Sequence, residues 1–299
     1  MTHWLIISII SAATWGIVSV LDKRILNSYI VSPIIYFSWI GLISILYSII
    51  LFIFIPFTSS YTIEFLWPLF AGMIWGIGII ILFQALKKED SSNIIPLYYT
   101  HPIISILIAL FFLNETINNY QIIGISLTMI GTIIIASQKF KKNNKLKNFT
   151  PIIFAIVAGI FIGIAMVLNK IGLEKFEISE TFILRNIGFG IIGLLVIKRA
   201  NITFFKKVLK QPKLFKLLLF TNLIWGPMAV IIHQFALNSA PLTLVTPILA
   251  TTPLFTFLLS SILSIKRLNI LQESITIDTL IRKGLGALII VTGIIFIQL

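Results

Sequence analysis

Three ionisable side chains lie inside long apolar stretches of the sequence: His101, Arg185 and His233. An ionisable group in the apolar part of a membrane helix costs free energy, so it indicates a functional site. The guanidinium of Arg185 could pair with a carboxylate or phosphate, or instead with Glu180, or it could extend to the membrane surface. His101 could respond to protons or bond a solute, or stay neutral with a backbone carbonyl as partner. His233 lies near the end of its stretch, where we expect an interfacial position.

Aromatic and hydroxyl side chains add further candidates. Trp15, Trp75 and Trp225 lie well inside apolar stretches, although tryptophan favours membrane interfaces. An indole there suits either the wall of a binding site, with its flat face and N–H donor, or packing between helices. Hydroxyl groups near four prolines could bond a solute or a carbonyl that proline leaves free; they belong to Tyr98, Tyr99, Thr100, Thr246, Thr251 and Thr252. The predicted solute-binding residues are Trp15, Trp75, Tyr98, His101, Arg185, Trp225 and Thr246.

Sequence motifs for catalysis and for cofactor binding are absent. The chain has no cysteine, which excludes thiolate metal sites, and no His-Glu-x-x-His motif, Walker loop or glycine-rich nucleotide turn. No two aspartates lie within five residues of each other to hold a magnesium diphosphate. We therefore predict no catalytic residue, no metal and no cofactor.

The composition predicts an integral membrane protein. Of 299 residues, 58% are hydrophobic and only 11% are charged, against roughly 25% charged in soluble domains. A helix needs about 20 mostly apolar residues to cross a bilayer, and no β-barrel alternation appears. We predict an all-α membrane protein with ten transmembrane helices, over residues 4–21, 32–55, 65–86, 94–113, 120–137, 151–169, 181–197, 217–237, 241–265 and 284–299.

The basic residues predict the orientation. All but three of the 23 lysines and arginines fall in the connections that follow odd-numbered spans. Short basic loops stay in the cytoplasm, so both termini are expected outside the cytoplasmic membrane. The net charge of +13 comes from these short loops, so we do not expect nucleic-acid binding.

Two halves of the chain resemble each other. Ala85, Leu86, Pro96 and Pro102 are matched, at one offset of 151 residues, by Ala236, Leu237, Pro247 and Pro253. A basic linker, 139–150, separates a first five-span repeat, 1–138, from a second, 151–299. Because five is odd, the repeats cross the membrane in opposite senses, which predicts a 5+5 inverted repeat with the binding site between the halves. Proline loosens a buried helix, so we predict hinges at Pro96, Pro102, Pro247 and Pro253.

These residues resemble the EamA family of the drug/metabolite transporter superfamily over nearly the whole chain. The matching segments are Ala13-Thr14-Trp15-Gly16, Ala85-Leu86, Pro102, Phe112-Leu113-Asn114-Glu115, Gln121-Ile122-Ile123-Gly124, Gly131, Gln234-Phe235-Ala236-Leu237, Pro253-Leu254-Phe255, Gly286 and Gly293. The family's second loop glutamate is replaced by Lys266. The resemblance implies ten spans in two EamA domains and movement of small organic molecules, often amino acids or other metabolites.

We therefore predict a secondary transporter that moves a small organic metabolite, an amino acid or a related and potentially anionic compound, by alternating access. Its expected partners are this solute and the lipid bilayer. Small multidrug relatives use a buried glutamate in the first span, but residues 4–21 contain no acid. That argues against proton-coupled export of lipophilic cations by this route. The alternatives are a non-transporting interaction or receptor-like subunit, and an intramembrane enzyme that depends on His101.

Overall fold

The computed structural model describes residues 3–29, 32–59, 62–89, 91–137, 149–197, 199–263 and 277–299, and it is helical with no strand in these ranges. The elements are α1 (His3–Tyr29), α2 (Pro33–Phe54), the 3-10 turn η1 (Ile63–Phe65), α3 (Leu66–Leu86), α4 (Ser91–Tyr98), α5 (His101–Phe112), α6 (Asn119–Ala136), α7 (Thr150–Lys175), α8 (Ile178–Leu195), α9 (Arg199–Lys210), α10 (Pro212–Leu219), the π-helical turn η2 (Phe220–Trp225), α11 (Gly226–Ser239), α12 (Leu242–Leu249), α13 (Thr252–Leu263) and α14 (Ile277–Gln298).

Ten candidate spans confirm the predicted number. The fourth combines α4 with α5, the eighth combines α10, η2 and α11, and the ninth combines α12 with α13. The predicted linker, 139–150, and Lys266 lie almost wholly outside the described residues. The chain is therefore a multi-pass membrane protein, built from helices with the length and composition to cross a bilayer.

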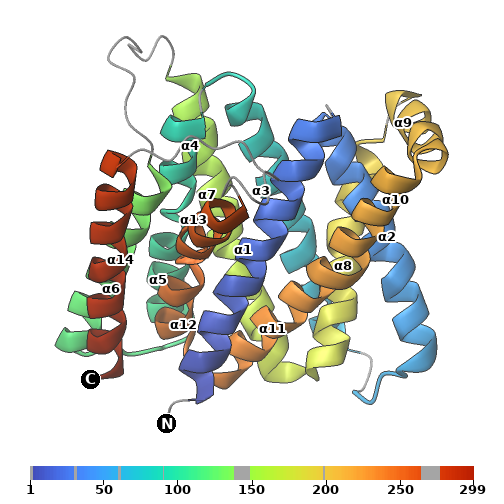
Figure 1. Cartoon of the computed structure of the whole chain (residues 1–299). Helices are drawn as coiled ribbons and strands as arrows, with labels where there is room; N and C mark the ends of the chain where they lie inside the picture. The colour runs from blue at the N-terminus through green and yellow to red at the C-terminus, as the bar shows by residue number, and fades with distance from the viewer. Residues whose placement is uncertain are drawn as a thin grey trace.

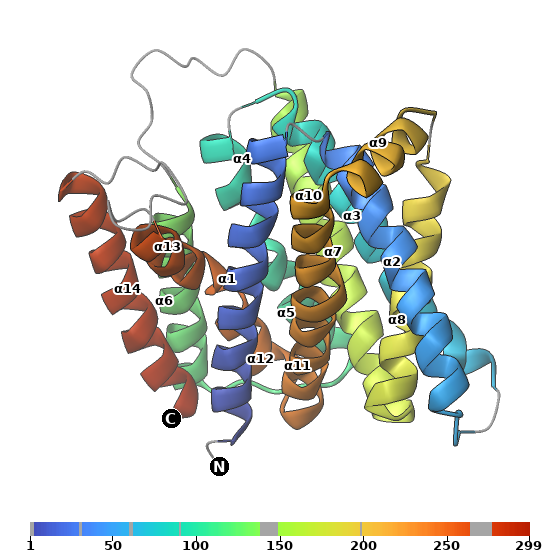
Figure 2. The same cartoon turned by 45° about the vertical axis from the view of Figure 1, so that its right-hand side comes forward.

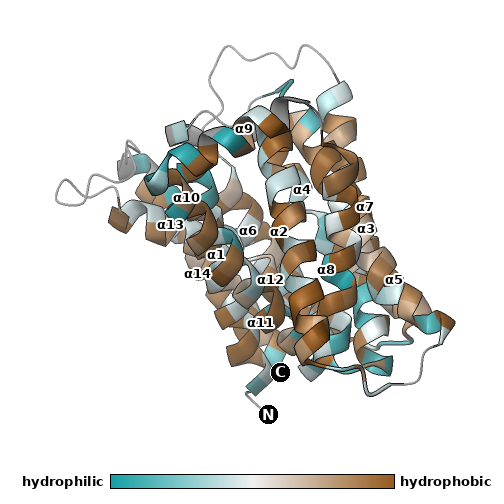
Figure 3. Ribbon diagram, turned by 90° about the vertical axis from the view of Figure 1, so that its right-hand side faces the viewer, coloured by the Kyte–Doolittle hydropathy of each residue, from teal (hydrophilic) through white to brown (hydrophobic). Residues whose placement is uncertain are grey.

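The helices form one upright bundle (Figures 1 and 2). α6 packs along α14, α2 along α8, and α1 against α11 and α13, while α3 packs against both α7 and α8. Both termini lie at one end of the bundle, and α9 lies at the opposite end (Figure 1). Apolar residues cover the outward faces of the spans, and hydrophilic residues gather near the ends (Figure 3). Hydrocarbon, and not water, therefore suits the bundle's outer surface.

Spans four and nine are interrupted between their prolines. At the first break the hydroxyl of Thr100 donates to the carbonyl of Leu97 at 2.6 Å, and at the second Thr251 donates to Ile248 at 2.7 Å. Thr251 and Ile248 follow Thr100 and Leu97 by 151 residues, the same offset as the repeated prolines. The breaks thus lie where the repeated prolines predict them, and whether they flex stays a prediction.

Threonine also satisfies a carbonyl that proline leaves free in the second break. Pro253 cannot donate to Leu249 four residues earlier, and the hydroxyl of Thr252 donates to that carbonyl at 2.8 Å. Of the two roles left open for these hydroxyls, Thr100, Thr251 and Thr252 therefore bond backbone carbonyls.

Matched glycines of the two halves make matched contacts. A Cβ on Gly16 of α1 would lie 2.7 Å from the Cβ of Phe255 on α13, and one on Gly163 of α7 would lie 2.8 Å from the Cβ of Ile104 on α5. Phe255 follows Ile104 by the same 151 residues. The first helix of each half therefore packs against the interrupted span of the other half, α1 against α13 and α7 against α5. An inverted repeat would give such reciprocal contacts, although the 5+5 repeat itself stays a prediction.

Two elements differ from expectation. α1 continues beyond the predicted end at Leu21, so Asp22 lies inside the first helix and span. Residues 199–210, expected as part of a basic connection, form the helix α9, whose Phe204 and Val208 pack into the core beside α2. An apolar face hidden among basic residues allows a helix to lie along the bundle end.

Candidate functional site

Four side chains from four different spans gather in the bundle: Trp15 of α1, Trp75 of α3, Arg185 of α8 and His233 of α11. The imidazole of His233 lies edge-on to both indoles, with ring centroids 6.4 Å from Trp15 and 6.1 Å from Trp75. The guanidinium carbon of Arg185 lies 4.8 Å from the ring centroid of Trp75, a cation–π contact. We call these four residues the central cluster. Trp15, Trp75 and Arg185 were predicted as solute-binding residues, whereas His233 was expected at the membrane interface.

Glycines at the interface of α3 and α8 bring Trp75 to Arg185. A Cβ on Gly72 would collide with the carbonyl oxygen of Arg185, and one on Gly188 would collide with that of Leu69. Trp75 follows Gly72 by three residues and so shares its helix face. Without side chains at these glycines, the two backbones approach closely enough for the indole to lie beneath the guanidinium.

Arg185 is buried without an anionic partner. Its residue is 5% exposed, and no hydrogen bond or ion pair joins its guanidinium to any residue of the described ranges. Glu180 instead accepts bonds from the backbone N–H groups of Thr58 and Ser59 and from the Ser59 hydroxyl, at 2.7, 3.0 and 2.6 Å. The structure thus removes two interpretations of Arg185, pairing with Glu180 and extension to the surface.

His233, expected near the membrane interface, is buried inside the bundle. The residue is 6% exposed and its ring lies between two indoles. Its sequence position near the end of 217–237 suggested an interface, but η2 and α11 extend the eighth span to Ser239. His233 is thus six residues before the end of its helix and is enclosed by protein.

A buried amide pair lies next in sequence to His233. The side-chain nitrogen of Gln234 donates to the side-chain oxygen of Asn169 on α7 at 3.3 Å. The remaining Asn169 nitrogen and Gln234 oxygen are enclosed without partners. Neither residue was predicted as part of a site. An uncharged amide inside an apolar span could have indicated them, because such side chains form hydrogen bonds between membrane helices.

Tyr98 and His101 form a second group at the break of span four. Their ring centroids lie 5.2 Å apart, and Nδ1 of the buried His101 has no partner. A Cβ on Gly159 of α7 would lie 3.8 Å from the Cα and the Cβ of His101, an ordinary van der Waals distance, so α7 packs beside the break. Of the two alternatives left open for His101, a backbone carbonyl as partner is therefore not found at Nδ1 among the described residues.

The two remaining predicted residues have no hydrogen bond or ring contact with these groups among the described residues. Thr246 of α12 is 0% exposed and its hydroxyl is unpaired. Trp225, the last residue of η2, packs edge-on against Phe220 with centroids 6.3 Å apart, and Phe220 is itself exposed on the bundle surface. The structure therefore does not bring Trp225 into contact with the central cluster.

One acidic site near the end of α1 was missed. The hydroxyl of the buried Tyr36 lies 2.6 Å from Oδ1 of Asp22 and 3.3 Å from Oδ1 of Asn222, in the π-helical turn η2. π-Helical turns occur frequently at functional sites. The described residues contain no group of three histidine, cysteine, aspartate or glutamate side chains that could hold a metal ion.

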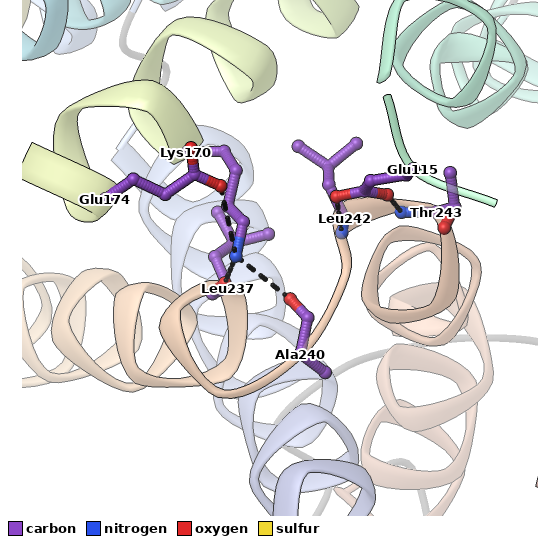
Figure 4. Close-up of polar contacts among 7 residues, drawn as sticks. All are labelled: Glu115, Lys170, Glu174, Leu237, Ala240, Leu242 and Thr243. Atoms are coloured by element: carbon purple, nitrogen blue, oxygen red, sulfur yellow. Dashed lines mark hydrogen bonds and ion pairs between the residues drawn. The ribbon is translucent and has the colours of Figure 1, made fainter. Parts of the chain in front are cut away.

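Polar side chains bind the connection between α11 and α12 (Figure 4). Nζ of Lys170 donates to the carbonyls of Leu237 and Ala240 at 2.8 and 3.1 Å, which satisfies the end of α11. The carboxylate of Glu115 accepts the first two N–H groups of α12, those of Leu242 and Thr243, at 2.7 and 2.8 Å. Lys170 and Glu115 thus hold the two helix ends at one connection.

Comparison with known proteins identifies the first half of the chain. Residues 2–137 match the model of the EamA-like transporter family. This part of the chain belongs to that family. A stretch of 60 residues, 20% of this chain, is 38% identical to an uncharacterized protein, MJ1333.1, of Methanocaldococcus jannaschii, and covers 44% of that protein. The chain therefore aligns with less than half of this relative.

A solved structure shares the fold of this EamA-like protein. A crystal structure of another protein superposes with a TM-score of 0.74, and the match covers 99% of this chain and 97% of that one at 12% sequence identity. At that identity the likeness shows the fold alone. The chain is thus a multi-pass membrane protein by its ten candidate spans, and its residues 2–137 are similar to a transporter family.

Proposed function

We propose that this protein is a secondary transporter that moves a small organic metabolite, such as an amino acid or a related compound, across the cytoplasmic membrane by alternating access. The central cluster is the observation that carries this proposal, because Trp15, Trp75, Arg185 and His233 come from spans in both halves of the chain. A solute bound there contacts both halves, so a change in their relative position exposes it to one side and then the other.

The interrupted spans supply the proposed motion. The breaks of spans four and nine lie between Pro96 and Pro102 and between Pro247 and Pro253. A helix break concentrates the change of backbone angles in a few residues. The repeats 1–138 and 151–299 then rock about these breaks, while basic loops stay in the cytoplasm and both termini stay outside.

Flux into proteoliposomes tests the proposal. The purified protein is reconstituted and offered a labelled pool of metabolites, and accumulated solutes are identified by mass spectrometry. We expect selective uptake that is lost in Trp75→Ala and kept in Trp225→Ala, the matched tryptophan outside the central cluster.

Absence of uptake by folded, reconstituted protein would contradict transport and support the receptor-like subunit. Release of a chemically changed product that disappears in His101→Gln would instead support the intramembrane enzyme. Equal uptake by Trp75→Ala and the unmodified protein would remove the central cluster from the pathway.

A further inference from the structure

We infer that the transported solute is a small monocarboxylate with a flat apolar body, and that Arg185 binds its carboxylate; this inference rests on the proposed function. The guanidinium is always charged, and Arg185 as a whole residue is only 5% exposed. No acidic side chain of the described ranges pairs with it. A buried charge without a counter-charge is strongly unfavourable, so the missing anion comes from the ligand.

The charge of the central cluster favours a carboxylate over a phosphate. Arg185 is its one permanently charged member, and a carboxylate carries one negative charge. A phosphate monoester carries about −1.5 to −2 at pH 7, which would leave uncompensated negative charge among indole rings. A single carboxylate also matches the planar fork of the guanidinium in a bidentate pair.

The neighbours of Arg185 favour a flat apolar body. Trp75 lies beneath the guanidinium, and the imidazole of His233 connects Trp75 to Trp15. Indole faces attract flat hydrocarbon groups by offset or edge-on stacking. The Nε1 of Trp15 is also enclosed without an acceptor, so the cluster holds two unpaired donors, one charged and one neutral, and both suit carboxylate oxygens.

A panel of four related probes tests this inference on detergent-purified protein. Phenylacetate carries the carboxylate, phenylacetamide is its neutral counterpart, phenyl phosphate carries the larger charge, and phenethylamine carries the opposite charge. We expect phenylacetate alone to raise the melting temperature with concentration and to quench tryptophan fluorescence. Equal binding of phenylacetamide, tighter binding of phenyl phosphate, or no response to phenylacetate would overturn the inference.

Substitutions then assign the carboxylate to Arg185. Loss of a charged hydrogen bond weakens binding by about 10- to 100-fold, so Arg185→Gln should lose that much affinity for phenylacetate and Arg185→Lys less. Arg24→Gln, an exposed arginine near the end of α1, is the control and should bind normally. Undiminished binding by Arg185→Gln would overturn the assignment.

A measurement without ligand separates binding from a structural role. Because the guanidinium has no anionic partner, Arg185→Met should raise the melting temperature of the unliganded protein, whereas a structural arginine would lower it. Transport without phenylacetate binding would end this inference and leave the proposed function intact. Phenylacetate binding at Arg185 without flux of any solute would contradict the proposed transport and leave only the carboxylate-binding site at Arg185.

Discussion

At the residue scale, Lys170 and Lys175 differ only in their surroundings. Lys170 bonds two backbone carbonyls in a buried position, whereas Lys175 pairs with Glu64 at 2.6 Å where both side chains are at least 40% exposed. Unpaired buried acceptors cost about 1–3 kcal/mol, and an exposed ion pair contributes about 0–1 kcal/mol. We predict that Lys170→Met lowers the melting temperature clearly and Lys175→Met barely; equal losses would contradict the capping role.

Glu115 gives a second prediction at this scale. Asn114 adopts a left-handed backbone angle, φ 52°, which asparagine tolerates, and the turn directs Glu115 to the first N–H groups of α12. Glu115→Gln removes the charge that favours this helix start. We expect the connection to open more often, so a cysteine at the buried Thr243, made by Thr243→Cys, should react faster with an impermeant maleimide.

The control for this experiment is Glu174→Gln, since Glu174 is 51% exposed and 3.9 Å from Lys170. The chain contains no native cysteine, so every labelling signal comes from the introduced thiol. Unchanged labelling in Glu115→Gln would show that the carboxylate does not hold the connection closed.

At the element scale, glycines set the distance between α6 and α14. A Cβ on Gly124 would lie 2.6 Å from the carbonyl oxygen of Gly293, whereas one on Gly284 meets nothing within 4 Å. Gly124→Ala should therefore lower the melting temperature, because the helices must separate. Gly284→Ala should leave the melting temperature unchanged or raise it, since alanine favours helix by up to about 1 kcal/mol. The opposite order would contradict this packing.

The proline breaks give a prediction for the same scale. The double variant Pro102→Ala and Pro253→Ala restores two N–H donors and should make spans four and nine more continuous. We expect normal membrane insertion, slower transport, and slower hydrogen exchange at residues 99–101 and 250–252. Pro33→Ala is the control, because Pro33 begins α2, where the N–H has no helical partner. Unchanged transport together with unchanged hydrogen exchange would contradict the predicted hinges.

At the scale of the whole molecule, we predict that the two ends of the bundle face opposite sides of the membrane. Lys210 ends α9, at the end opposite the termini, whereas Glu64 lies in η1 at the end that carries both termini (Figure 1). We predict that an impermeant maleimide labels Glu64→Cys in intact cells and Lys210→Cys only after permeabilisation. Labelling of Lys210→Cys alone in intact cells would reverse the orientation predicted from the basic loops.

Much of the fold could be predicted from local features. Apolar length predicts each span because hydrocarbon cannot bond an exposed backbone, and proline predicts each break because it removes a donor within the same helix. The ends of elements were less predictable. Leu21 ended the first predicted span, yet α1 continues through Asp22, whose carboxylate has a partner in Tyr36 on the next helix.

The sequence by itself determined the membrane class, the ten spans and the position of the breaks, since each depends on neighbours along the chain. Only the tertiary structure decided that Arg185 lies over Trp75 and not beside Glu180, that His233 is buried between indoles, and that Trp225 packs against Phe220 elsewhere. A span that is apolar on all sides carries little periodicity to mark its inward face. Close approach at glycines such as Gly72, between helices far apart in sequence, sets which side chains meet.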